Sequence, residues 1–210
     1  YNYENFDGYL RAIKKAIKSN KNRKFLYAYY PFHDDLCHKN GISNNKVKRH
    51  FNQLNKKLKS FLKEFKEKNT MFIITSDHGM IDVPKSKRID LNKHPKFEET
   101  LILPLCGERR YVYCYVKPSK EKQFVNYVKT IFKNKCYIIK SENLMNKGYF
   151  GLNKPHPKFK DRIGDYVLIM KENYAMSDRL GFQNKTNFNL GSHGGLSNEE
   201  MYVPLIIIKK

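Results

Sequence analysis

The chain has 210 residues, of which 40% are hydrophobic and 29% are charged, so it can bury one substantial core and is not a disordered chain. No apolar run approaches the roughly 20 residues that span a bilayer. The formal net charge of +21 would suit an anionic partner, but the lysines are spread through every polar segment. We therefore expect a solvated basic surface that helps to steer an anionic ligand, and we do not expect nucleic-acid binding.

The first 76 residues predict a helix, a strand, a second helix and a second strand. Apolar residues at helical spacing predict a helix over residues 4–20, and residues 25–30 form an apolar run that reads as a strand. A basic segment with one apolar face predicts a long helix over residues 43–68 with Ser43 as its N-cap. A further strand is expected over residues 71–76. This order implies a right-handed crossover and parallel pairing of the two strands.

The chain changes character after residue 80. Pro84, Pro95 and Pro104 predict loop with short elements up to residue 105. Strands are expected over residues 111–116, 136–139 and 165–170, with a helix over residues 119–133. This portion predicts an inserted α+β lobe. The apolar run at residues 203–208 returns the chain to the core.

Three of the strand-like runs lie next to carboxylate or imidazole groups. Asp34 and His38 follow the run at residues 25–30, and Asp77 and His78 follow the run at residues 71–74. His193 stands in a glycine-rich turn before the last run. Ligand crevices in open α/β sheets lie at strand ends, so these groups are candidates for a shared site.

These clusters together resemble the alkaline phosphatase superfamily, most closely its type I phosphodiesterase and nucleotide pyrophosphatase branch. The shared pattern is an Asp four residues before a His, then Asp-His-Gly-Met at residues 77–80, then a late His. Residues 162–168 and 194–205 also resemble family segments. The resemblance implies an α/β fold with a mainly parallel sheet, helices on both faces and the inserted lobe. The expected division is residues 1–94 and 181–210 for the core and 95–180 for a cap lobe.

The same resemblance implies a site for two divalent metal ions, with zinc expected and manganese as the alternative. Asp34, His38 and His193 would bind one ion. Asp77 and His78 would bind the second. Carboxylate and imidazole donors suit zinc, and paired metals are common in phosphate chemistry.

One part of the family pattern has no counterpart in this sequence. The family carries a Thr or Ser nucleophile and another metal-binding Asp well before the position of Asp34, and too few residues precede Asp34 here for that unit. We therefore expect this chain to be part of a longer protein, with the nucleophile upstream of Tyr1. For the same reason we expect the N-terminus to be missing, and the sequence leaves localisation and oligomeric state open.

The function implied is metal-dependent hydrolysis of a phosphate ester by a phosphodiesterase or nucleotide pyrophosphatase. Its partner would be a small phosphate ester or nucleotide. One alternative is a phosphatase or phosphomutase of the same superfamily. Another is an inactive remnant that keeps metal ligands without a nucleophile. Fold-level resemblance does not choose among substrates.

Several residues near the motifs have competing interpretations. Asp35 is an alternative ligand to Asp34, while His33 and His156 are weaker site candidates. His50 and His94 are expected to be solvated. The four cysteines lack zinc-knuckle spacing, and Cys106 and Cys114 are expected to be reduced core residues.

Overall fold

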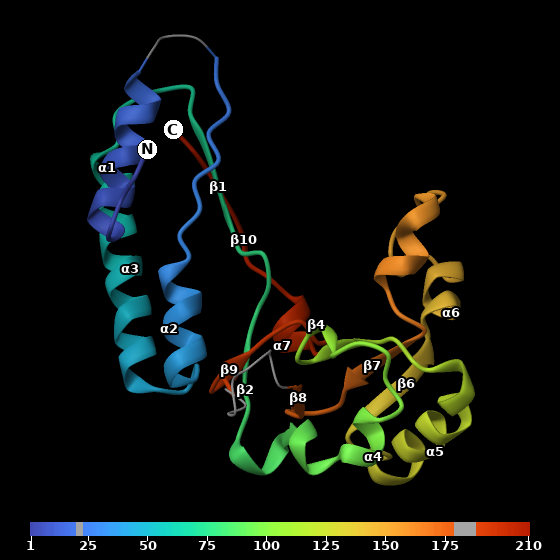
Figure 1. Cartoon of the computed structure of the whole chain (residues 1–210). Coiled ribbons are helices and arrows are strands. Elements are labelled where there is room, and N and C mark those ends of the chain that lie inside the picture. Colours follow the sequence, from blue (N-terminus) through green and yellow to red (C-terminus); the bar gives the residue numbers. More distant parts are fainter. Residues whose placement is uncertain (20–22, 179–187) are drawn as a thin grey trace. The chain divides into compact units, whose positions relative to one another are not determined.

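A computed structural model describes residues 1–19, 23–178 and 188–210 (Figure 1). The chain divides into two compact units. Residues 1–76 and 204–210 form what we call the helical unit, and residues 77–203 form the sheet unit. The expected boundary between residues 180 and 181 lies outside the described residues. None of the helices in the described ranges combines the length and apolar composition that crossing a bilayer requires.

The helical unit combines helices with one two-stranded sheet. Its elements are α1 (Phe6–Lys18), α2 (Phe32–Asn40), α3 (Asn45–Glu64), β1 (Met71–Thr75) and β10 (Leu205–Lys209). The predicted helix over residues 4–20 is confirmed as α1. Helix α3 confirms the second predicted helix, but its N-cap is Asn44 and not Ser43. The Asn44 side chain accepts a hydrogen bond from the backbone N–H of Lys46 at 2.8 Å.

Strands β1 and β10 pair antiparallel, from Met71 opposite Lys209 to Thr75 opposite Leu205. On one face, the Phe72 ring lies 5.9 Å from that of Phe61 in α3 and 4.9 Å from that of Phe65. The opposite face leaves apolar side chains exposed, because side chains alternate across a strand. These exposed side chains are Met71, Ile73, Leu205 and Ile207.

The prediction of a strand over residues 25–30 is wrong for the described structure. Two of its carbonyl groups are engaged by side chains: the Tyr9 hydroxyl donates to the Ala28 carbonyl at 3.1 Å, and the Tyr3 hydroxyl donates to the Tyr29 carbonyl. The Tyr30 ring packs against Phe6 at 5.0 Å. The segment therefore lies against α1 through its tyrosines and forms no parallel ladder with β1.

The sheet unit is built around the four-stranded antiparallel sheet β4-β5-β7-β6. Its strands are β4 (Cys106–Glu108), β5 (Tyr111–Cys114), β6 (Cys136–Lys140) and β7 (Tyr166–Met170). Its longest helix is α5 (Glu121–Ile131). The strands and helix expected in the lobe are thereby confirmed.

Shorter elements complete the sheet unit. They are β2 (Ile81–Asp82), η1 (Lys85–Lys87), β3 (Arg88–Asp90), η2 (Leu91–Lys93), α4 (Pro95–Glu98), η3 (Pro118–Lys120), α6 (Ser141–Asn146), η4 (Pro157–Arg162), β8 (Ala175–Ser177), β9 (Gly191–Ser192) and α7 (Asn198–Met201). Among the described residues only β3 and β8 pair in parallel. The mainly parallel sheet expected from the sequence is thus not seen: the described sheets are small and mostly antiparallel, since β1 pairs with β10 and residues 25–30 form no ladder.

The core of the sheet unit forms where α5 packs on the sheet. Phe124 and Val128 of α5 are buried together with Leu168 of the inner strand β7. All five residues of β7 are buried. Cys114 and Cys136 are buried free thiols, and burial raises the pKa of Cys136 to about 12. Cys106 is exposed, so the prediction that it lies in the core is wrong.

The core predicts a large cost for truncating Leu168, which is fully buried. Leu168→Ala should lower the free energy of unfolding by about 2–5 kcal/mol, because it removes buried methyl groups and leaves a cavity. The matched control is Leu152→Ala at a side chain that is 96% exposed. Denaturant unfolding should show little change for Leu152→Ala. Equal effects of the two substitutions would contradict the assigned core.

Candidate functional site

The residues expected to bind metal fall into both units. Asp34 and His38 belong to the helical unit, whereas Asp77, His78 and His193 belong to the sheet unit.

Asp34 and His38 lie on helix α2, which the sequence did not predict. Residues four apart share one helix face, and His38 Nε2 lies 3.4 Å from Asp34 Oδ2. The other carboxylate oxygen, Asp34 Oδ1, is buried and has no hydrogen-bond partner among the described residues. A buried carboxylate oxygen left unpaired is costly, so this atom is suited to a cation.

Asp35 faces a different group. Its Oδ2 accepts a hydrogen bond from Lys39 Nζ at 2.6 Å, and both side chains are exposed. The Asp35 carboxylate therefore has a cationic partner in the next helical turn. This contact favours Asp34 over Asp35 as the ligand candidate on α2.

His78 lies in a turn that directly follows β1 in the sequence. Its Nδ1 lies 2.9 Å from the Gly79 carbonyl, and because a carbonyl only accepts, Nδ1 carries the proton. In the neutral ring Nε2 is then the acceptor nitrogen. Metal-binding histidines commonly donate their other N–H to a backbone carbonyl in this way. Asp77 Oδ1 lies 3.7 Å from His78 Nε2.

His193 lies beside His78 because two short strands pair. Strand β2, which follows the His78 turn, runs antiparallel to β9, with Ile81 opposite Ser192. His193 directly follows β9. The two imidazole rings stack with their centroids 3.6 Å apart and their planes within 15°. The sheet unit thus brings together two predicted ligands that are far apart in the sequence.

A buried ion pair lies behind these two turns. Arg110 Nε donates to Glu200 Oε1 at 2.6 Å, and Arg110 Nη2 donates to Glu200 Oε2 at 2.9 Å. Both side chains are 1% exposed. Burial alone would raise the pKa of Glu200, but hydrogen bonding and charge attraction from Arg110 outweigh it and lower that pKa.

Glu200 also contacts both histidine-bearing turns. Its Oε1 accepts from the Gly195 N–H, and its backbone carbonyl accepts from the Gly79 N–H, each at 2.8 Å. Glu200 was not among the site residues predicted from the sequence. The available signal was the Ser197-x-x-Glu200 spacing, which forms a capping box at α7 just before an apolar run.

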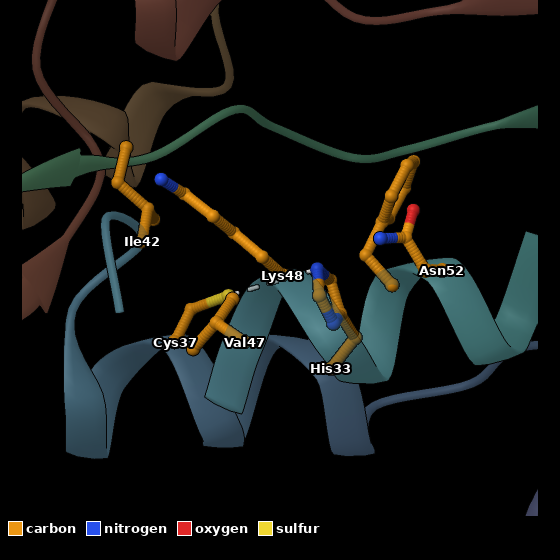
Figure 2. Close-up of a pocket in the computed structure, with 7 residues that line it drawn as sticks. His33, Cys37, Ile42, Val47, Lys48 and Asn52 are labelled. Carbon is orange, nitrogen blue, oxygen red and sulfur yellow. Dashed lines mark hydrogen bonds between the residues drawn. The ribbon is translucent and has the colours of Figure 1, made fainter. Parts of the chain in front are cut away.

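The other histidines have local partners. His33 Nδ1 lies 3.0 Å from His50 Nδ1, so His50 is paired and not simply solvated. His33 and Cys37 line a pocket of about 360 Å³ in the helical unit, and Figure 2 shows their side chains on helix α2. Burial lowers the pKa of His33, which favours its neutral form. His94 is also half-buried, with Nδ1 2.9 Å from the Tyr127 hydroxyl. His156 accepts from the Lys158 N–H and acts as the N-cap of η4.

A comparison with models of known protein families gives a match. A family model described as type I phosphodiesterase/nucleotide pyrophosphatase matches residues 3–196. Curated protein sequences yield no match.

Solved structures give the fold. Murine ectonucleotide pyrophosphatase/phosphodiesterase 5, an inactive form in complex with AMP, is similar with a TM-score of 0.71 and 22% identity over 98% of this chain and 53% of its own. The human counterpart has a TM-score of 0.73 and 19% identity, over 99% of this chain and 53% of its own. Phosphonoacetate hydrolase from Sinorhizobium meliloti 1021, in complex with phosphonoformate, has a TM-score of 0.57 and 21% identity, over 83% of this chain and 43% of its own. The fold is alkaline phosphatase-like, and the chain spans about half the length of these relatives.

The close packing at Gly79 allows a direct test of the His78 turn. A Cβ at this position would lie 1.9 Å from the Glu199 carbonyl oxygen, so Gly79→Ala must displace the turn. If His78 is a ligand, zinc affinity measured by calorimetry should fall about 10- to 100-fold, the range typical when groups that orient a ligand are lost.

The control for this substitution is Gly8→Ala in α1, where a Cβ meets no atom closer than 3.3 Å. Zinc affinity should be unchanged in that variant. Unchanged zinc affinity in Gly79→Ala would show that the geometry of this turn does not matter for binding.

Proposed function

Because the chain belongs to the type I phosphodiesterase/nucleotide pyrophosphatase family, we propose that it forms the metal-binding part of a phosphate-ester hydrolase. The family is one of metal-dependent hydrolytic enzymes. The chain spans about half of its solved relatives, so the activity proposed is that of the whole protein. The observation that carries the proposal is the stacking of His78 and His193, with Nε2 as the acceptor nitrogen of the neutral His78 ring.

The donor set fits two divalent ions, with zinc as the proposed metal and manganese as the alternative. We assign Asp34, His38 and His193 to one ion, and Asp77 and His78 to the other. The buried, unpartnered Asp34 Oδ1 supports this assignment, since a cation would satisfy it. Nitrogen and oxygen donors of this kind are those that zinc prefers.

Bound metal ions would supply Lewis-acid stabilisation of the phosphoryl oxygens and a nucleophile of lowered pKa. The residues of this chain would hold those ions and fix their orientation. His78 would bind the ion through Nε2, because its Nδ1–H donates a hydrogen bond to the Gly79 carbonyl. The net charge of +21 would steer an anionic substrate toward the protein.

The substrate proposed is a phosphodiester or a nucleotide pyrophosphate. The AMP complex of the murine relative supports a nucleotide, and the phosphonoformate complex of the bacterial hydrolase supports a small phosphorus oxyanion. The nucleophile is proposed to lie outside this chain. Thr75 is the hydroxyl at the end of β1, but phosphate binding is favoured at a helix N-terminus, which this position lacks.

We further propose that the whole protein completes a mainly parallel sheet on the helical unit. Apolar side chains of β1, β10 and residues 25–30 are exposed, including Phe25 at 88% and Tyr27 at 81%. Exposed apolar surface of this kind marks an interaction site. The solved relatives have about as much chain again as this one, and strands from that part are the proposed occupants.

The proposal predicts different behaviour for this chain and for a form extended upstream. Residues 1–210 should bind one metal ion more firmly than two, because three ligands are assigned to one ion and only two to the other. They should hydrolyse bis(p-nitrophenyl) phosphate poorly, because the nucleophile for the covalent step is proposed to lie outside this chain. The extended form should gain the second metal and the activity together, as measured by metal analysis and chromogenic turnover.

His193→Ala in the extended form supplies the ligand test, and His156→Ala is its matched control. Removal of His193 should lower metal content, whereas removal of His156, which caps η4, should not. Full activity with two bound metals in residues 1–210 would contradict the assignment of the nucleophile. Faster turnover of a phosphate monoester than of the diester would favour the phosphatase alternative.

A further inference from the structure

The Arg110–Glu200 pair joins segments of the sheet unit that are distant in sequence. Arg110 directly precedes β5, and its guanidinium also donates to the backbone carbonyls of Glu172, at 2.8 Å, and of Tyr174. These carbonyls belong to the connection between β7 and β8. The arginine is therefore attached to the central sheet on one side and to Glu200 on the other.

Every hydrogen-bonding oxygen of Glu200 is used at this junction. Oε1 accepts from Arg110 Nε and from the Gly195 N–H, and Oε2 accepts from Arg110 Nη2 and, at 3.4 Å, from the Ser197 N–H. Its main-chain carbonyl accepts from the Gly79 N–H. One residue thus fixes the turn after His78 and the turn after His193.

The backbone of both turns is closely packed at its glycines. A Cβ at Gly195 would lie 2.6 Å from Glu200 Oε2 and 2.9 Å from Arg110 Nε, so the backbone lies directly against the ion pair. At Gly79 the obstacle is the backbone carbonyl of Glu199. Displacement of Glu200 would therefore shift both turns together.

We propose that Arg110 and Glu200 are positioning residues that hold the His78 and His193 imidazoles face to face for metal binding. The proposal rests on the metal-binding role assigned to these histidines above. A buried ion pair contributes little net stability compared with apolar side chains of the same volume. Its fixed bidentate geometry instead suits a role in orientation.

The first test substitutes one atom in the pair. Glu200→Gln keeps the shape but turns one acceptor into a donor, which then faces the N–H groups of Arg110 or the turn. The matched control is Glu142→Gln, which makes the same change in an ion pair with Lys160 where both side chains are more than 60% exposed. The readout is the nuclear Overhauser contact between the His78 and His193 ring protons in the metal-free 210-residue chain.

The contact should be present in the wild type and in Glu142→Gln and lost in Glu200→Gln, while the Glu200→Gln chain remains folded by circular dichroism. Leu168→Ala, which removes a buried side chain of β7, should keep the contact despite its lower stability. A ring contact that persists in Glu200→Gln would overturn the proposal.

The second test measures cobalt(II) binding by visible absorption. Glu200→Gln should lower the affinity about 10- to 100-fold, and Glu142→Gln should leave it unchanged. Arg110→Lys keeps the positive charge but loses the planar, bidentate guanidinium, and it should lower cobalt affinity by the same factor. Unfolding of both Glu200→Gln and Arg110→Lys would overturn the proposal, because the pair would then support the whole fold.

The metal role is checked separately by His78→Ala and His193→Ala. If both reduce cobalt affinity while Glu200→Gln does not, the positioning role fails and the proposed function stands. If neither reduces it, the proposed function fails, and the positioning role for metal binding fails with it. In the first case, retention of the ring contact in Glu200→Gln would show that the two turns stay ordered without the ion pair.

Discussion

The geometry of the candidate site in the sheet unit depends on one buried ion pair, Arg110 with Glu200. Both side chains are 1% exposed, and removal of one partner of such a pair typically costs about 3–5 kcal/mol because the other charge is left buried. The carboxylate is therefore restricted to one position. That position in turn restricts the backbone at Gly79 and Gly195, and so the two histidines beside them.

The two units differ in how completely they bury apolar surface. The sheet unit has a closed core in which α5 covers a sheet whose inner strand is buried throughout. In the helical unit α3 covers one face of the β1–β10 ribbon in part, and the side chains of the other face are exposed. This contrast is consistent with a sheet unit that completes its own core and a helical unit whose sheet continues in the longer protein, as proposed above.

Much of this structure could be predicted from local sequence patterns. Helical periodicity identified α1, α3 and α5, and the Asp-His-Gly-Met motif identified the turn that carries His78. The missed features depend on distant contacts. Tyrosine hydroxyls from the first ten residues engage the carbonyls of residues 25–30, and the partner of Glu200 lies 90 positions away. Periodicity carries no information on such pairings. The capping-box spacing from Ser197 to Glu200 was a local signal in the sequence, but it indicates a helix start and not the partner of Glu200.

The most direct test is a crystal structure of the zinc-loaded protein with zinc located by anomalous scattering. The account predicts a zinc ion about 2.0–2.1 Å from His78 Nε2, with the His193 imidazole also bound to zinc and His78 Nδ1–H still donating a hydrogen bond to the Gly79 carbonyl. Zinc bound away from both imidazoles, or bound to His78 through Nδ1, would contradict it.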